Sequence, residues 1–494
     1  MLLKIDIQPP KLFNSLHDLI RMAFPGYELR EGRYRAEDDY LALTLSELGE
    51  QVLFSGYISI KGKVTEERES YPLSLDGFDL SPQMKSRARI FIFRLLCKHL
   101  DRNFNAYGIL TGVRPVKIVH RLLDEGWDVD SIVAKLVKVY LLTPEKADLL
   151  IGVANANRPF LLSAAKAQKQ VSIYIGIPFC PSRCYYCSFP GAVLRDYKRD
   201  ISPFLEALLK EMNVIGDYIE RSGLSVQTVY LGGGTPTVLN KTDLARIFDV
   251  LHCKYISGAT VEVTVEAGRP DTLSLSKLEL LKQAGVDRVC INPQTMNDDT
   301  LRLIGRNHDS RSVDQAVGWA RSAGIKHINM DLIVGLPGEN AGHLESTAAR
   351  VLDLKPDNVT VHTLAVKRGS TMAETEGRSN ILDRVAEVEQ GVSFLAQIFT
   401  QHGYSPYYLY RQKYMQASME NLGYAQDDGF CIYNIQMIEE RQTIIALGGG
   451  ASSKFVNAAD WSLTSFHNPK DPNSYIQTLD RLIARKVDKL RALN

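Results

Sequence analysis

Six short apolar segments alternate with amphipathic segments from Val171 onward, and this alternation constrains the fold more than any other feature. The apolar segments are VSIYIGI (171–177), VQTVYLGG (226–233), TVEVTVEA (260–267), DRVCIN (287–292), KHINMDLIVG (326–335) and DNVTVHT (357–363). Each is typical of a buried strand. The intervening segments, 203–223, 243–254, 274–285, 312–324 and 343–355, have helical periodicity, and several end in glycine, the usual C-terminal cap. Six β-then-α units predict a parallel sheet with right-handed crossovers.

Six units are two short of a full barrel, so the sequence predicts an α/β fold built on an incomplete (β/α)6 barrel. In such folds the functional residues lie at the carboxyl ends of the strands. We expect three parts: an N-terminal α+β domain (1–165) without an assigned role, the partial barrel (166–365), and a small C-terminal domain (366–494) that covers the substrate.

The N-terminal part begins with alternating runs, 40–48 and 51–60, that predict an antiparallel sheet. Helical patterns follow at 81–100, 130–142 and 143–158, and 164–170 is a plausible linker. The C-terminal part is irregular and rich in tyrosine, and it ends in a helical pattern at 472–493.

The charge balance excludes two broad classes of partner. Lys and Arg number 58 against 57 Asp and Glu, which argues against a general nucleic-acid or membrane binder. No apolar run is as long as a membrane span. Lys4 and Asp6 interrupt the N-terminal segment, so it does not resemble a secretory signal. We therefore expect a cytoplasmic protein.

Three of the seven cysteines lie within eight residues, directly after the first strand of the barrel. Cys180, Cys184 and Cys187 have C-x3-C-x2-C spacing. Three thiolates on one loop can bind three irons of a [4Fe–4S] cluster, which leaves the fourth iron open to a chelating small molecule. A zinc site is the weaker hypothesis, since it needs a fourth ligand nearby. For Cys97, Cys253, Cys290 and Cys431 we expect buried apolar thiols.

Polar residues follow the other barrel strands at the same predicted rim. Gly233, Gly234 and Thr235 follow the second strand; glycines there let backbone approach a ligand closely, although a tight turn is the default interpretation. The remaining rim residues are Glu266, Gln294, Asp331 and Arg306. A buried carboxylate needs a partner or a ligand. Instead of binding a ligand, Glu266 could form a salt bridge to Arg288 or Arg269.

The cysteine motif, with an aromatic residue before its third cysteine, resembles the signature of radical S-adenosylmethionine (SAM) enzymes. The segments YIGIPFCPSRCYYCSF, LGGGTPT, VTVEAGRPD, NPQTMNDDTLRLIGRNH and NMDLIVGLPG, in this order, resemble the oxygen-independent coproporphyrinogen III oxidase family. The resemblance covers roughly residues 170–460. The extra N-terminal part resembles the longer coproporphyrinogen dehydrogenase-like branch of that family.

The resemblance implies cofactors, a reaction and site residues. Cys180, Cys184 and Cys187 would hold a [4Fe–4S] cluster, with Tyr174 and Tyr186 beside it. One or two SAM molecules would bind, and the SAM contacts would be Gly233, Gly234, Thr235, Glu266, Gln294, Arg306 and Asp331. A 5′-deoxyadenosyl radical would start the oxidative decarboxylation of two propionates of coproporphyrinogen III, or act on a related tetrapyrrole. Flavodoxin or ferredoxin would supply electrons to a monomeric enzyme.

The substrate carries four carboxylates and therefore needs cations. Arg183, Lys367, Arg368 and Arg411 are the candidates, and Arg368 is the one we assign to the catalytic set. Two departures from the family pattern affect the site. Gly176 stands where the family commonly has histidine, and Pro293 lies in a segment that usually reads GVQ.

Two further functions are compatible with the motifs. One is a haem chaperone of the same family without oxidase activity, and the other is a different radical SAM enzyme acting on a tetrapyrrole. A chaperone needs an axial ligand for haem. His308, His327, His362 and His402 are the candidates near the predicted site, although an isolated histidine is more often structural.

Overall fold

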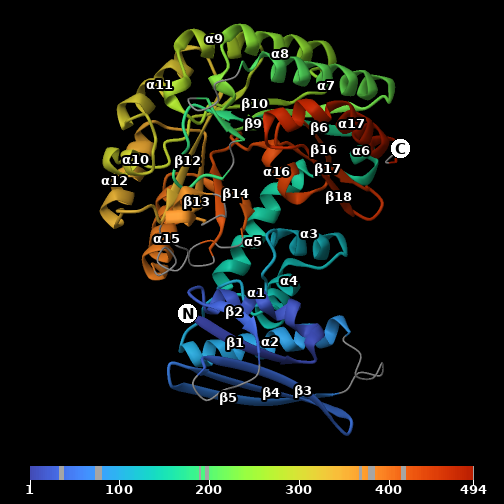
Figure 1. Cartoon of the computed structure of the whole chain (residues 1–494), viewed down its shortest axis with the longest axis vertical. Coiled ribbons are helices and arrows are strands. Elements are labelled where there is room, and N and C mark those ends of the chain that lie inside the picture. Colours follow the sequence, from blue (N-terminus) through green and yellow to red (C-terminus); the bar gives the residue numbers. More distant parts are fainter. Residues whose placement is uncertain are drawn as a thin grey trace. The chain divides into compact units, whose positions relative to one another are not determined.

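The computed structural model describes the chain apart from nine short segments: residues 33–37, 73–80, 189–190, 195–199, 366–369, 376–383, 413–414, 416–418 and 493–494. The chain forms two compact units. One comprises residues 1–152 and 376–385, and the other comprises residues 153–375 and 386–494. Each unit has its own sheet (Figure 1).

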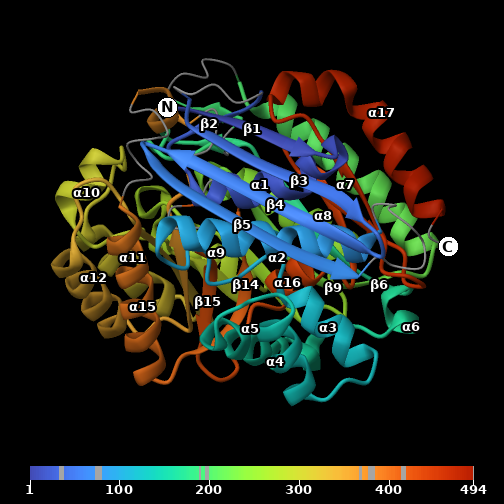
Figure 2. The same ribbon diagram turned by 90° about the horizontal axis from the view of Figure 1, so that it is seen from below.

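The N-terminal unit contains a five-stranded sheet in the order β2-β1-β3-β4-β5, whose strands lie side by side in Figure 2. The strands are β1 (Leu2–Gln8), β2 (Glu28–Glu31), β3 (Tyr40–Leu48), β4 (Gln51–Ile60) and β5 (Lys63–Pro72). The predicted strands at 40–48 and 51–60 form and pair antiparallel. The sheet as a whole is mixed, because β1, which the sequence analysis did not identify, pairs parallel with both β2 and β3.

Alternating burial along β4 explains why this sheet has one apolar face. Val52, Phe54 and Ile58 are fully buried in a core that also takes residues from α1 (Phe13–Ala23) and α2 (Pro82–Leu100). The Ser81 side chain caps α2 by accepting a hydrogen bond from the Met84 backbone N–H. The remaining helices before the barrel are α3 (Val116–Asp124), α4 (Val129–Lys138), α5 (Pro144–Asn157) and α6 (Ala164–Ala167).

All six predicted barrel strands are present and parallel in the second unit. They are β6 (Gln170–Ile177), β9 (Ser225–Gly233), β10 (Glu262–Glu266), β11 (Arg288–Cys290), β12 (His327–Val334) and β13 (Asn358–Thr363). They pair in sequence order. The predicted α/β fold with six consecutive parallel strands is therefore confirmed.

Helices cover the outer side of these strands (Figure 1). They are α7 (Ser202–Arg221), α8 (Lys241–Lys254), α9 (Leu275–Gln283), α10 (Asp298–Leu303), α11 (Ser310–Ser322) and α12 (Ala341–Asp353). Asn240, Ser274, Asp309 and Asn340 each cap a helix with a side-chain oxygen, which fixes where the chain leaves each strand–helix loop.

The C-terminal segment extends the same sheet at both ends. On one side β15 (Asn421–Ala425) and β14 (Ser405–Tyr410) join β13 in antiparallel pairing. On the other side β16 (Thr443–Gly448) joins β6 in parallel pairing, and β17 (Ser452–Val456) and β18 (Leu463–His467) follow it. The sheet therefore stays open, and it crosses the boundary that we placed at residue 365.

Four helices complete the described part of this segment: α13 (Thr371–Thr375), α15 (Val385–Gln401), α16 (Ile432–Glu439) and α17 (Pro472–Arg491). The final helix lies where the sequence predicted it. In the described residues, we find no helix whose length and apolar character would let it cross a membrane.

Candidate active site

The three cysteines lie on the loop that follows β6. The loop begins with the two-residue strand β7 (Phe179–Cys180), which pairs with β8 (Ala192–Val193). Cys180 and Cys184 are buried and Cys187 is partly exposed. The Cys187 N–H donates to the Cys184 carbonyl at 3.0 Å, so backbone hydrogen bonding holds the second and third thiols on one turn.

The glycine turn after β9 packs directly against this loop. A Cβ on Gly234 would lie 2.4 Å from the Phe179 carbonyl oxygen and 3.1 Å from the Cys180 sulfur. The Thr235 N–H donates to the Phe179 carbonyl at 2.8 Å, and its hydroxyl lies 3.3 Å from the Cys180 sulfur. We expected these glycines to admit a ligand. In the structure, Gly234 is required for the close approach of the cysteine loop.

The predicted rim residues and the three cysteines line one cavity of about 330 Å³, called here the cysteine-side cavity. Its wall includes Tyr174, Cys180, Cys184, Tyr186, Cys187, Gly233, Gly234, Thr235, Glu266, Gln294, Arg306 and Asp331. These residues come from the ends of five different strands or the loops after them. The strand assignment made from sequence therefore placed the side chains on the correct side of the sheet.

Asp331 is held in a network of neutral and basic groups. The Asn292 and Asn329 side-chain amides each donate to its carboxylate at 2.8 Å, and His362 Nε2 lies 3.5 Å from it. Burial alone raises the pKa of Asp331, but hydrogen bonding and charge from His362, aided by Asn329, outweigh it and hold that pKa below its ordinary value. Asp331 is therefore an ionised carboxylate with a fixed orientation.

Gln294 has a strained backbone and an unsatisfied side chain. Its φ is +68°, a region that residues other than glycine seldom adopt. Hydrogen bonds to the backbone of Asp331 and Ile333, each 2.9 Å, hold it there. Among the described residues nothing bonds its buried Oε1. A buried acceptor without a partner costs about 1–3 kcal/mol, so this atom is suited to accept a hydrogen bond from a ligand.

Arg306 is buried, and its two terminal guanidinium nitrogens bond to the protein itself, whereas its Nε has no partner among the described residues. Its guanidinium donates to the carbonyls of Gly268 and Asn292, and it lies 3.4 Å from the Tyr186 hydroxyl. These bonds join the ends of the third and fourth barrel strands to the cysteine loop.

Glu266 does not form either of the salt bridges considered from sequence. It accepts a hydrogen bond from the Tyr230 hydroxyl at 2.8 Å, while Arg288 pairs with Glu262 and Arg269 pairs with Asp271. Burial raises the pKa of Glu266 to about 7; the Tyr230 hydrogen bond opposes this shift, and the Asp331 charge adds to it. Glu266 is thus a carboxyl that changes charge near neutral pH.

Replacing Glu266 with Gln should remove a pH-dependent loss of stability. The pKa of Glu266 rises from 4.5 to about 7 on folding, so the folded chain keeps the carboxyl proton to a higher pH than the unfolded chain does. The free energy of unfolding therefore falls as the pH rises between these two values. We expect Glu266→Gln to exceed the parent at pH 8 by roughly 1–3 kcal/mol and to match it near pH 4. Denaturant unfolding of the cofactor-free protein measures this; parallel pH curves for the two proteins would contradict it.

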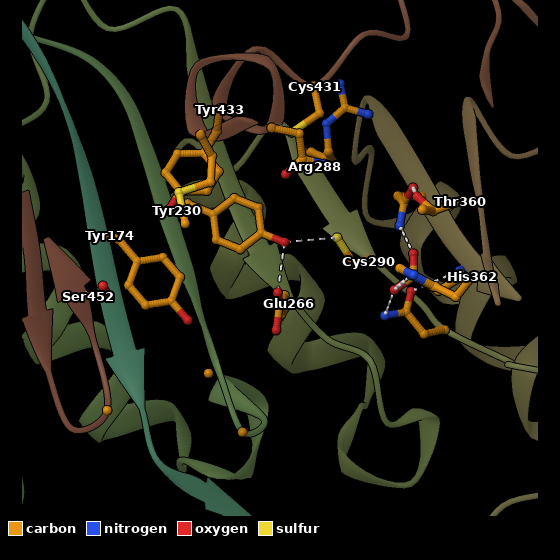
Figure 3. A pocket seen from close by; sticks show the side chains of 18 of the residues that line it. Tyr174, Tyr230, Glu266, Arg288, Cys290, Thr360, His362, Cys431, Tyr433 and Ser452 are labelled. Atoms are coloured by element: carbon orange, nitrogen blue, oxygen red, sulfur yellow. Dashed lines mark hydrogen bonds and ion pairs between the residues drawn. The ribbon is translucent and has the colours of Figure 1, made fainter. Parts of the chain in front are cut away.

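A second cavity of about 410 Å³ adjoins the first and is called here the tyrosine-lined cavity (Figure 3). The residues that line both cavities are Tyr174, Gly233, Gly234, Glu266, Asn292, Asp331, His362 and Tyr410. Tyr230 stacks on Tyr433 with ring centroids 4.4 Å apart, and Tyr174 stacks beside both at 6.0 and 6.2 Å. The two cavities therefore meet at shared residues that include Tyr174 and Tyr410, whereas the stacked Tyr230 and Tyr433 line the tyrosine-lined cavity alone.

The comparisons with known proteins agree with this geometry. Residues 174–351 match the radical SAM superfamily. A protein of Bacillus subtilis (strain 168), the oxygen-independent coproporphyrinogen-III oxidase-like protein HemZ, is 34% identical over 495 residues, which covers 100% of this chain and 98% of the relative. The chain belongs to this oxidase-like family of radical SAM proteins. The heme chaperone HemW of the same organism is 36% identical over 197 residues, 40% of this chain and 51% of HemW.

One solved structure supports the fold of this radical SAM family member. Coproporphyrinogen III oxidase (HemN) from Escherichia coli superimposes with a TM-score of 0.52 at 24% identity, covering 66% of this chain and 72% of that chain. Since identity is low, this likeness concerns the fold alone.

The residues present fit the cofactors that radical SAM proteins carry, a [4Fe–4S] cluster and SAM. No group of three or more His, Cys, Asp or Glu side chains in the described residues is arranged to hold a single metal ion. A cluster needs a different arrangement, because each thiolate binds its own iron. The unsatisfied Gln294 Oε1 and the ionised Asp331 in the same cavity are suited to the ribose and amino groups of SAM.

Only two of the four cationic residues proposed from sequence to bind the substrate lie in the described part of the chain. Lys367 and Arg368 lie outside the described residues. Arg183 is exposed and belongs to neither cavity wall as the described residues form it, and Arg411 is buried. Sequence reasoning did not propose Arg288 and Lys470 as substrate cations, but both line the tyrosine-lined cavity.

Gly176, the first of the two departures from the family pattern considered from sequence, is fixed by packing. A Cβ there would lie 2.8 Å from the Gly449 carbonyl oxygen and 3.2 Å from the Ala451 Cβ. The glycine-rich turn after β16 therefore occupies the space that a side chain at 176 would need.

The lone cysteines differ from the buried apolar thiols that we expected. Cys253 is exposed, so that prediction was wrong, whereas Cys97 is partly buried and packs against the apolar core of the N-terminal unit. Cys290 and Cys431 are buried, but both line the tyrosine-lined cavity, where the Cys431 thiol donates to Glu262 at 3.3 Å. These contacts could not be predicted from strand periodicity, because they join segments that are far apart in the chain.

Proposed function

We propose that this radical SAM protein oxidatively decarboxylates two propionates of coproporphyrinogen III to vinyl groups, giving protoporphyrinogen IX. The observation that carries the proposal is the tyrosine-lined cavity, which shares a wall with the cysteine-side cavity. A substrate there would lie next to the site where the cofactors generate a radical. Membership of the oxidase-like family supports the choice of a tetrapyrrole.

The cavity lining suits a macrocycle that is apolar at its centre and anionic at its rim. Stacked tyrosine rings offer large apolar faces with polar hydroxyls. Lys470 supplies an exposed ammonium group in the wall, and Arg288 supplies a guanidinium already paired with Glu262. Lys470 is therefore the cation with more freedom to meet a propionate.

The proposal assigns a separate role to each group of residues in the candidate site. When bound, the cluster and SAM would supply the radical that abstracts hydrogen from the propionate β-carbon; loss of CO2 and transfer of one electron to a one-electron acceptor would complete each vinyl group. Cys180, Cys184 and Cys187 hold the cluster, and Tyr174 and Tyr186 flank it. Glu266, Gln294 and Asp331 orient SAM. Arg306 holds the segments after β10 and β11 together by donating hydrogen bonds to the carbonyls of Gly268 and Asn292.

The identity of the reductant and the oligomeric state belong to the same proposal. We propose flavodoxin or ferredoxin as the electron donor and a monomer as the active form. Because each abstraction consumes one radical, two decarboxylations require two SAM molecules, bound together or in turn.

An anaerobic turnover assay tests the proposal. Iron-replete protein supplied with SAM, coproporphyrinogen III and a strong reductant should form protoporphyrinogen. Two 5′-deoxyadenosine and two CO2 should appear per product. Cleavage of SAM without any change in coproporphyrinogen would remove this substrate from the proposal.

Haem binding is the second candidate function, and the position of His362 is the observation that favours it. Of the four histidines considered, His362 lines both cavities. His327 pairs with Asp357, His402 is exposed, and His308 is buried with its pKa lowered to about 3, mainly by burial. If the assay fails, tight haem binding whose absorption spectrum changes in His362→Ala would favour the chaperone function.

A further inference from the structure

Arg269 lies beside the cysteine loop and contacts it directly. It follows β10 and is 4% exposed. One guanidinium nitrogen, Nη1, donates to the Cys184 sulfur at 3.7 Å and to the Ser182 carbonyl at 3.3 Å. The other, Nη2, donates to the Ser182 hydroxyl at 3.0 Å. Arg269 thus contacts both a cysteine sulfur and the backbone between two of the cysteines.

A carboxylate fixes the guanidinium in this orientation. Asp271 accepts from Nε at 3.1 Å and from Nη2 at 3.2 Å, which is a two-point contact. Such pairs restrict the rotation of the planar fork. The remaining nitrogen is therefore aimed at the sulfur before any cofactor binds.

Other cations near the loop are directed elsewhere. Arg306 donates to backbone carbonyls and the Tyr186 hydroxyl, and Lys470 donates to the Ser188 carbonyl at 3.3 Å. Arg269, by contrast, brings a charged donor to a cysteine sulfur.

We propose that Arg269 is a positioning residue that makes the cluster easier to reduce, by donating a charged hydrogen bond to the sulfur of Cys184. The inference rests on the family's cluster being held by the three cysteines and does not depend on the substrate. Reduction adds negative charge that spreads onto the thiolate sulfurs. A nearby cation and N–H donor stabilise that charge, so they raise the reduction potential.

The test compares midpoint potentials of iron-replete proteins in a redox titration followed by the paramagnetic signal, without SAM or substrate. Because the reduced cluster carries one more negative charge, the charged hydrogen bond is stronger in the reduced state than in the oxidised state. We therefore expect Arg269→Gln to lower the equilibrium constant for one-electron reduction about tenfold, which is about 59 mV. The midpoint potential of Arg269→Lys should fall between those of the parent and Arg269→Gln, because an ammonium group keeps the positive charge but lacks the planar fork of the guanidinium.

Arg302→Gln is the matched control, since it removes an arginine that is 70% exposed and paired with Asp299 on α10. It should leave the potential unchanged. An iron-replete Arg269→Gln protein with the parental potential would overturn the proposal.

If Arg269→Gln does not retain iron, Arg269→Lys decides the question. That change keeps a positive charge but removes the planar fork that places Nη1 on the Cys184 sulfur, so the potential should fall below that of the parent. A parental potential in iron-replete Arg269→Lys would overturn the proposal, and a lower one would support it.

Discussion

Cys184→Ala should yield a folded protein that neither holds a reducible cluster nor cleaves SAM. The thiol lies in the middle of the motif, on a turn whose shape is set by backbone hydrogen bonds rather than by the side chain. Removing it therefore removes one iron ligand and leaves the loop in place. Iron and sulfide analysis after anaerobic reconstitution should fall from about four irons per chain to near background. SAM cleavage should fall with it.

The choice of control follows from the structure. Cys253 is exposed on α8 and lines neither cavity, so Cys253→Ala should keep full iron content. Cys431→Ala is a poorer control, because that thiol donates to Glu262 in the wall of the tyrosine-lined cavity. Normal iron content and normal SAM cleavage in Cys184→Ala would remove the cysteine motif from the proposed site.

Periodicity was enough to predict the barrel strands and the side of the sheet on which the site lies. Strand alternation depends on neighbours in the sequence, and the carboxyl ends of parallel strands share one edge. Glu266 and Asp331 lie on two of these strands and Gln294 follows a third, and they line one cavity for this reason. The cysteine spacing was equally local, so the loop could be identified without a fold.

Contacts between distant segments could not be predicted in the same way. β16 pairs with β6 although the whole barrel sequence separates them, and this pairing brings Gly449 against Gly176. The pairing of Arg269 with Asp271 is local, but its contact with Cys184 depends on how two loops meet. The parallel pairing of β1 with β3 likewise depends on a crossover that alternation does not encode.

Gly234→Ala should be the most damaging single-methyl change among the glycines that line the cysteine-side cavity. Gly234 is not among the glycines with positive φ, whereas Gly233 has a φ of +110°. The substitution at 234 therefore tests space alone. The added Cβ would lie 2.4 Å from the Phe179 carbonyl oxygen, 2.8 Å from the Phe179 carbonyl carbon and 3.1 Å from the Cys180 sulfur. Backbone atoms cannot rotate away as a side-chain end can.

The glycine turn and the cysteine loop must therefore separate in this variant. We expect the free energy of unfolding to fall by about 1–3 kcal/mol, as for other overpacked sites. Most of the iron should also be lost, because displacing the Cys180 sulfur moves one of three ligands that must bind the same cluster. Gly258→Ala is the control, since no atom lies within 4 Å of the added Cβ. If Gly234→Ala held full iron at parental stability, the close packing of this turn on the cysteine loop would not be what shapes the site.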